Sequence, residues 1–112
     1  MTLKGNMTFR EALEIVDKAK RAVHLPEADT RLVKLSKERI GVQYHNTYIV
    51  RIQKDGNYVL AASKRDEATL FRLNFYSPAK IIIGSNSEWF MQDGLRFTDY
   101  IVIDSDGKPI RS

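Results

Sequence analysis

The sequence predicts an α+β fold, in which an N-terminal amphipathic helix packs on an antiparallel sheet that carries a short inserted helix. Apolar residues recur at helical spacing from Phe9 to Val23, which predicts a helix with one buried face. Apolar residues then alternate along residues 40–62, as they do in half-buried strands. Asp55-Gly56 interrupts this alternation and supplies the positive φ that a tight hairpin turn requires.

Composition limits the class of protein. A chain of 112 residues is expected to form a single domain, residues 1–112. The absence of cysteine excludes a disulfide framework and a thiolate zinc site. No apolar run approaches the roughly 20 residues of a membrane span, and no charged-then-apolar signal segment opens the chain. The sequence therefore predicts a cytoplasmic protein with no membrane partner.

The excess of positive charge is confined to the first two thirds of the chain. The net charge is +4, with nine Lys and Arg against six Asp and Glu in residues 1–40, and six against three in residues 41–80. Residues 81–112 carry three basic residues against five acidic ones. This distribution favours an anionic ligand of limited size over a long nucleic-acid track.

The first helix is expected to follow a lead-in over residues 1–6. Thr8 and Glu11 have the spacing of a capping box, so the helix should begin at Phe9. It should end before Leu25-Pro26, because proline disfavours a helical conformation in the residue before it. The apolar stripe consists of Phe9, Ala12, Leu13, Val16, Ala19 and Val23.

Strands dominate the middle of the chain. A first strand is expected over residues 31–36, and a turn at Lys37-Glu38 should lead into the central strand at residue 39. This outgoing strand is expected to extend to the Asp55-Gly56 turn, and the return strand to begin at Tyr58.

A second, shorter helix is expected over residues 65–75. Ser63 and Asp66 repeat the capping spacing before it, and Ser77-Pro78 ends it. The remaining strands are expected over residues 80–84, 88–91 and 98–103, with turns at Asn86, Asp93-Gly94 and Asp106-Gly107.

The sequence offers little catalytic chemistry. It contains no glycine-rich phosphate loop, no histidine spacing typical of zinc sites and no cysteine nucleophile. His24 and His45 are the only histidines, and a Ser–His–Asp triad stays open although no residue pattern indicates one. We therefore expect a binding protein, without metal or cofactor, rather than an enzyme.

The candidate binding residues lie in two polar segments that flank the predicted hairpin. In the first, Tyr44, His45, Asn46 and Thr47 interrupt a strand pattern, so this segment either turns the chain or contacts a ligand. The Asn46 side chain is expected to form hydrogen bonds with a base or a ribose. His45 is expected either to donate a hydrogen bond to phosphate or to orient the turn.

In the second polar segment, basic side chains alternate with aromatic ones. We expect Arg65 and Arg72 to hold phosphate, because a guanidinium forms paired charge-assisted hydrogen bonds with phosphate oxygens. The Asn74 side chain is expected to form hydrogen bonds with a base or a ribose. Other side chains suited to phosphate or to stacking on a base are Arg51, Lys64, Lys80, Phe71, Phe75 and Tyr76.

A resemblance covers roughly residues 32 to 110. The run Val42-x-Tyr44-His45-Asn46-Thr47-x-Ile49-Val50, followed by Asp55-Gly56, Leu60 and Ser63, resembles a group of small phage proteins that carry a Tyr-His-Asn-Thr box. Arg65, Thr69, Arg72 and Asn74 match the second polar segment of that group, whereas Ala68 and Leu70 replace its usual Thr and Lys.

In outline the chain also resembles the Thoeris anti-defence proteins of phages. Those proteins sequester cyclic ADP-ribose signals, and some relatives hold cyclic oligonucleotides, as symmetric oligomers. This outline resemblance implies a non-catalytic sponge for a nucleotide-derived immune signal. Thr69 is counted among the ligand-binding residues because it matches the group with the Tyr-His-Asn-Thr box. A homodimer or larger oligomer is also expected because the apolar strand predicted over residues 80–84 is hard to cover in a monomer.

Two other classes of function stay open. The basic and aromatic middle of the chain could bind single-stranded nucleic acid. The protein could instead be a protein-directed inhibitor or a structural phage accessory. Steep salt dependence over many phosphates would favour nucleic acid, and tight binding of a small nucleotide would favour the sponge.

Overall fold

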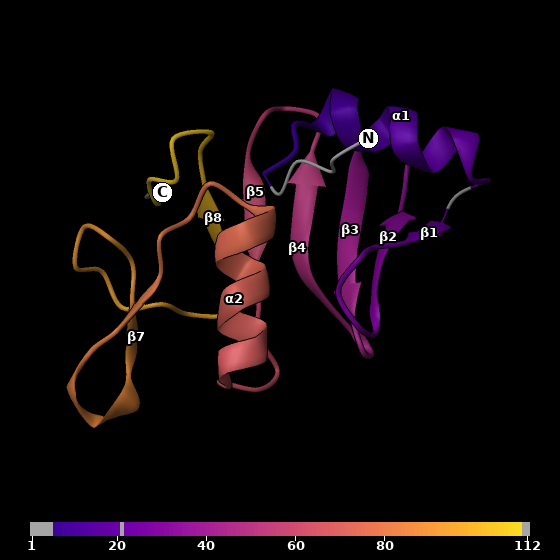
Figure 1. Ribbon diagram of the computed structural model, residues 1–112. Coiled ribbons are helices and arrows are strands. Elements are labelled where there is room, and N and C mark those ends of the chain that lie inside the picture. Colours follow the sequence, from indigo (N-terminus) through magenta and orange to yellow (C-terminus); the bar gives the residue numbers. More distant parts are fainter. Residues whose placement is uncertain (1–5, 21, 111–112) are drawn as a thin grey trace.

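The computed structural model describes residues 6–20 and 22–110, and it confirms the α+β fold (Figure 1). Over these residues the main sheet has six antiparallel strands in the order β1-β2-β3-β4-β5-β8, and β6 pairs with β7 in a second, two-stranded sheet. The predicted lead-in lies almost entirely outside the described residues. The elements are α1 (Phe9–Lys18), β1 (Ala22–His24), β2 (Thr30–Lys34), β3 (Arg39–Tyr44), β4 (Thr47–Gln53), β5 (Tyr58–Leu60), α2 (Glu67–Tyr76), β6 (Ile82–Ile83), η1 (Ser85–Ser87), β7 (Trp89–Phe90) and β8 (Ile101–Ile103).

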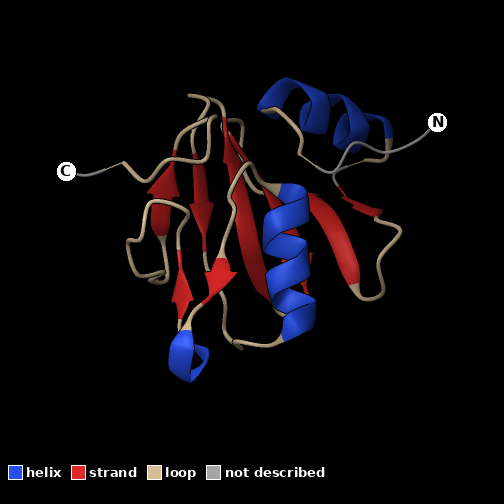
Figure 2. Ribbon diagram, turned by 60° about the vertical axis from the view of Figure 1, so that its left-hand side comes forward, coloured by secondary structure: helices blue, strands red, loops and turns tan. Residues whose placement is uncertain are grey.

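The helices meet the sheet in different orientations. Helix α2 runs alongside the strands, whereas α1 crosses near their ends (Figures 1 and 2). Helix α1 contacts β1, β2, β3 and β4, and α2 contacts β4. Neither helix is long and apolar enough to cross a membrane, and the same holds for every other helix of the described residues. The core joins buried residues of both helices to those of the sheet: Ala12, Val16, Leu32, Ile40, Val42, Val50, Ile52, Leu60, Leu73, Tyr76 and Ile103.

Helix α1 begins where the capping box predicts but ends earlier than expected. Thr8 Oγ1 accepts a hydrogen bond from the Glu11 N–H, and the Glu11 carboxylate accepts one from the Thr8 N–H. The prediction that this helix continues until Leu25-Pro26 is wrong, because α1 ends at Lys18. Lys20 has a φ of 57°, a left-handed conformation that ends helices. Val23, which fits the helical spacing, instead pairs with Leu32 between β1 and β2.

The long outgoing strand is in fact two strands joined by a hairpin. Tyr44 at the end of β3 pairs with Thr47 at the start of β4, so His45 and Asn46 form a two-residue loop. His45 has a φ of 55°, and such loops require positive φ. The polar interruption therefore turns the chain, which was one of its two expected roles. The second hairpin is confirmed, with Gly56 at a φ of 94° in the β4–β5 turn.

Helix α2 begins two residues later than predicted. Asp66 caps it, because its carboxylate accepts the Thr69 N–H at 2.8 Å, and Ser63 lies outside the helix. Ser77 ends the helix as expected. The three strands predicted after it shorten to β6, β7 and β8, and Gly94 and Gly107 have the positive φ expected of their turns.

Two glycine substitutions should separate conformational strain from steric overlap. Gly56 and Gly107 both have positive φ, so alanine at either position should cost about 1 kcal/mol of unfolding free energy. A Cβ at Gly107 would also overlap the Pro78 carbonyl oxygen, whereas a Cβ at Gly56 meets nothing within 4 Å. Urea denaturation should therefore show a larger loss for Gly107→Ala than for Gly56→Ala. Equal losses would contradict this explanation of the Gly107 turn.

Candidate functional site

A cleft of about 390 Å³ lies between the β3–β4 hairpin loop and the loop that leads into α2. We call it the hairpin cleft. Among the described residues it brings together five of the eight predicted binding residues, and it leaves out Arg65, Arg72 and Asn74. Its lining consists of Tyr44, His45, Asn46, Thr47, Ile49, Ser63, Lys64, Asp66 and Thr69.

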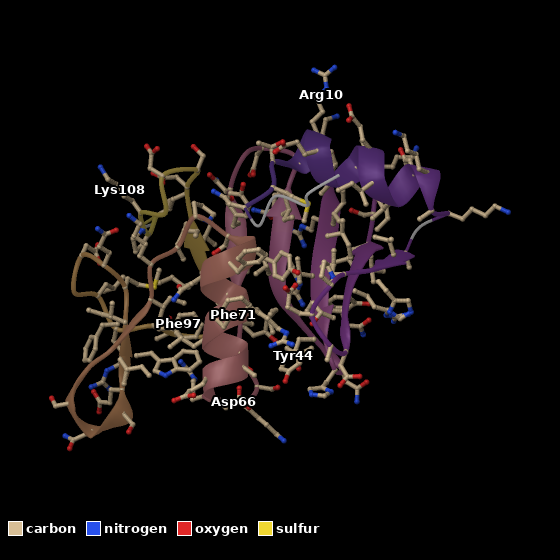
Figure 3. The ribbon with its side chains drawn as sticks, viewed as in Figure 1. Arg10, Tyr44, Asp66, Phe71, Phe97 and Lys108 are labelled. Carbon is tan, nitrogen blue, oxygen red and sulfur yellow. The ribbon has the colours of Figure 1, made fainter. Side chains whose placement is uncertain are left out.

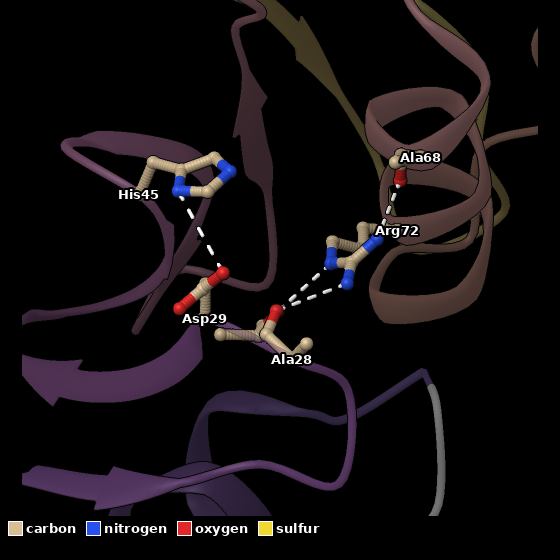
Figure 4. Close-up of polar contacts among 6 residues, drawn as sticks. Ala28, Asp29, His45, Ala68 and Arg72 are labelled. Atoms are coloured by element: carbon tan, nitrogen blue, oxygen red, sulfur yellow. Dashed lines mark hydrogen bonds and ion pairs between the residues drawn. The ribbon is translucent and has the colours of Figure 1, made fainter.

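The hairpin loop is anchored to the loop between β1 and β2. The His45 N–H donates to the Asp29 carbonyl oxygen at 3.1 Å. The His45 Nδ1 also lies 4.0 Å from the Asp29 carboxylate (Figure 4). Both residues have a φ of 55°, an uncommon conformation for residues other than glycine. The backbone bond holds the hairpin loop against the β1–β2 loop, and His45 lines the cleft with more than half of its side chain exposed.

The opposite wall comes from the start of α2 and the loop before it. The Thr47 hydroxyl donates to the Ser63 hydroxyl at 2.9 Å and links the two walls. Hydrogen bonding from Thr69 lowers the pKa of the Asp66 carboxyl below its ordinary value, and the charge of Lys64 adds to the effect. Lys64 and Asp66 therefore place one positive and one negative charge in the lining.

Arg72 lies behind the cleft and is 8% exposed. Its Nε donates to Thr30 Oγ1 at 2.8 Å, its Nη1 to the Ala68 carbonyl oxygen at 2.9 Å and its Nη2 to the Ala28 carbonyl oxygen at 3.0 Å (Figure 4). A guanidinium with all three nitrogens engaged by protein acceptors is poorly placed to receive a phosphate. The predicted role of Arg72 as a phosphate ligand therefore finds no support in this geometry.

Arg72 also positions the cleft wall. Its guanidinium carbon lies 4.1 Å from the centroid of the Tyr44 ring, within cation–π distance. The His45 ring centroid lies 4.2 Å from the same ring. Figure 3 shows Tyr44 on the side of the molecule where the hairpin loop meets α2. Arg72 thus holds the aromatic wall of the cleft from behind and does not line the cleft.

Arg65 lies outside the hairpin cleft, against a pair of aromatic rings. Its guanidinium carbon is 4.5 Å from the ring centroid of Phe97 and 5.3 Å from that of Trp89. Its Nη2 lies 3.7 Å from the Asp99 carboxylate. It lines a separate hollow of about 250 Å³, so its predicted partnership with the Tyr44–Thr47 segment is not observed.

Asn74 closes a turn of the backbone. Its side-chain amide accepts the Ile81 N–H at 2.8 Å and donates to the Ile81 carbonyl oxygen at 3.0 Å. Both ends of the amide are thus engaged by the segment that follows α2. Tyr76, suggested as a stacking residue, is fully buried, whereas Phe71 and Phe75 are exposed and stack on each other at 5.4 Å.

Sequence reasoning did not place Ile49, Ser63 and Asp66 in the site. Ser63 was noted as a capping residue and in the resemblance, and Asp66 as a capping residue. Lys64 was named among the side chains suited to phosphate, and it does line the cleft. The capping signal does locate the loop that forms the second wall, since the residues around a helix start are held in a fixed geometry.

Substitution of Arg72 should test whether its role is structural. Arg72→Lys keeps the positive charge but removes the planar guanidinium, so buried oxygen acceptors lose their hydrogen-bond donors. The free energy of unfolding should therefore fall by about 2 kcal/mol. Arg10→Lys is a matched control because the Arg10 side chain is 90% exposed, and it should change stability by less than about 0.5 kcal/mol. Urea denaturation of both variants measures the difference. Similar values for the two would refute a structural role.

The Asp66 cap should make stability depend on acid pH. The folded pKa lies below the ordinary 3.8, so the unfolded chain binds the proton more readily. The stabilisation is complete above the unfolded pKa and is lost as the pH falls through the folded pKa. Asp66→Asn keeps a capping acceptor without the titration, so its unfolding free energy should fall less between pH 5 and pH 2, the range we would scan by denaturation. Parallel curves would argue against this contribution.

No family model, curated protein or solved structure matches the chain.

Proposed function

We propose that the protein binds a small nucleotide-derived molecule in the hairpin cleft and releases it unchanged. On this proposal it is a phage anti-defence protein that sequesters an immune signal, either a cyclic ADP-ribose isomer or a cyclic oligonucleotide. The phage context derives from the resemblance carried by residues 44–47 and the segment after the hairpin, and the sequestering role derives from the outline resemblance to the Thoeris anti-defence proteins.

The observation that carries the proposal is the convergence of two polar segments. Residues 44–47 and residues 63–69 are separated along the chain by a complete hairpin, yet both line one cleft. Its volume of about 390 Å³ falls within the range of roughly 300–1,000 Å³ that is typical of small-molecule sites. Loops held on a rigid sheet are also where binding residues concentrate.

The lining offers groups that suit a phosphate, a ribose and a base. Lys64 supplies an ammonium for a phosphate oxygen. The Asn46 amide has no hydrogen-bond partner within residues 6–20 and 22–110, so it is free to bind a base edge or a ribose hydroxyl. The exposed His45 ring offers a surface on which a base can stack. Asp66 offsets the charge of Lys64, so the lining attracts an anionic ligand less strongly than Lys64 alone would.

The proposal includes a homodimer or larger oligomer. Large apolar side chains remain exposed, and such side chains often mark association surfaces. Among the described residues they are Phe71, Phe75, Ile82, Ile83, Tyr100 and Ile110.

Binding to a panel of cyclic nucleotides and cyclic ADP-ribose isomers tests the proposal by calorimetry. Lys64→Gln should weaken binding about tenfold, as expected for the loss of one charge-assisted hydrogen bond, with little change in melting temperature. Lys54→Gln makes the same change of charge in the β4–β5 turn, outside the cleft lining, and should bind like the wild type. Native mass spectrometry of protein purified from phage-challenged extract should show an oligomer carrying an intact nucleotide.

Two results would overturn this function. The absence of binding heat with every compound of the panel would exclude the sponge. Affinity that rises with the length of a single-stranded oligonucleotide and falls steeply with salt would favour the nucleic-acid alternative.

A further inference from the structure

A second hollow of about 290 Å³, which we call the Tyr100 hollow, adjoins the hairpin cleft. The two share Asn46, Thr47 and Ser63, so they adjoin along the Thr47–Ser63 hydrogen bond. Arg51 of β4 and Tyr100 belong to the Tyr100 hollow and not to the hairpin cleft. A molecule that crosses the Thr47–Ser63 pair can therefore reach both.

Tyr100 presents its ring in a constrained conformation. It is 62% exposed and has a φ of 68°, which is a rare conformation for a bulky residue. Its N–H donates to the Leu60 carbonyl oxygen at 2.7 Å, and the neighbouring Asp99 carboxylate accepts the Ala62 N–H at 2.9 Å. Such backbone strain persists only where surrounding contacts impose it, and it is common at ligand sites.

Each hollow carries one exposed aromatic ring and one cationic side chain. In the Tyr100 hollow the Arg51 guanidinium lies 5.4 Å from the Tyr100 ring centroid. In the hairpin cleft the exposed ring is His45, also at positive φ, and the cation is Lys64. Two exposed rings and two cations thus flank one shared hydroxyl pair.

We propose that the two hollows form one site for a dinucleotide, with one base in each hollow and the phosphate linkage over the Thr47–Ser63 pair. His45 and Tyr100 stack on the bases, and Lys64 and Arg51 neutralise the phosphate. Asp66 in one hollow and Asp99 in the other oppose further phosphates, which favours two nucleotides over a longer strand. This assignment rests on the proposed function and adds the class of ligand.

Calorimetry with the four linear homodinucleotides and the four corresponding 5′-mononucleotides tests the assignment. The best dinucleotide should bind at least about tenfold more tightly than its mononucleotide, because the second base adds a stacking contact. Tyr100→Ala should reduce dinucleotide affinity to that of the mononucleotide and leave mononucleotide binding in the hairpin cleft unchanged. Arg51→Gln, which keeps the Tyr100 ring, should weaken the dinucleotide severalfold.

Phe71→Ala is the matched control, because Phe71 is 51% exposed and lines neither hollow. It should leave both affinities unchanged. If mononucleotides bind and dinucleotides gain nothing, or if Tyr100→Ala and Arg51→Gln change nothing, the two-hollow site is overturned while the proposed function stands. If neither class binds, the two-hollow site is overturned, and the proposed function is decided separately by the panel of cyclic nucleotides and cyclic ADP-ribose isomers.

Discussion

The candidate site depends on a buried guanidinium. Arg72 reaches from α2 to the Ala28 carbonyl oxygen in the β1–β2 loop and to the Thr30 hydroxyl at the start of β2, and its guanidinium lies over the Tyr44 ring. Burying a cation is costly unless its N–H groups find acceptors, and here neutral oxygens engage all three nitrogens. Because these partners come from separate segments, the helix, the β1–β2 loop and the β3–β4 hairpin are held in one arrangement.

Arg65, which immediately precedes the Asp66 cap of α2, acts in a similar way. Its contacts with Trp89, Phe97 and Asp99 join that loop to the C-terminal part of the chain. Arg65 and Arg72, which were expected to bind phosphate, thus form their contacts within the protein. Lys64 takes no part in the contacts described for Arg65 and Arg72. It is the lysine that lines the hairpin cleft.

The walls of the cleft are loops, but they are not loosely held. Backbone and side-chain contacts fix His45 to Asp29, Thr47 to Ser63, and Asp66 to Thr69. A site whose polar groups are positioned before a ligand arrives loses less conformational entropy on binding. This property suits the proposed sequestering function, which requires affinity and no turnover.

The sequence by itself determined the features that depend on neighbours a few residues apart: the capping box at Thr8, the Asp-Gly turns, the presence of α2 and the α+β class. It also indicated both polar segments. Only the tertiary structure decided that Val23 belongs to a strand, and that residues 40–53 fold into a hairpin. The same is true of Arg72. Its side chain could reach a ligand or a carbonyl oxygen, and the choice depends on which distant acceptors the fold brings within hydrogen-bond distance, which no local pattern encodes.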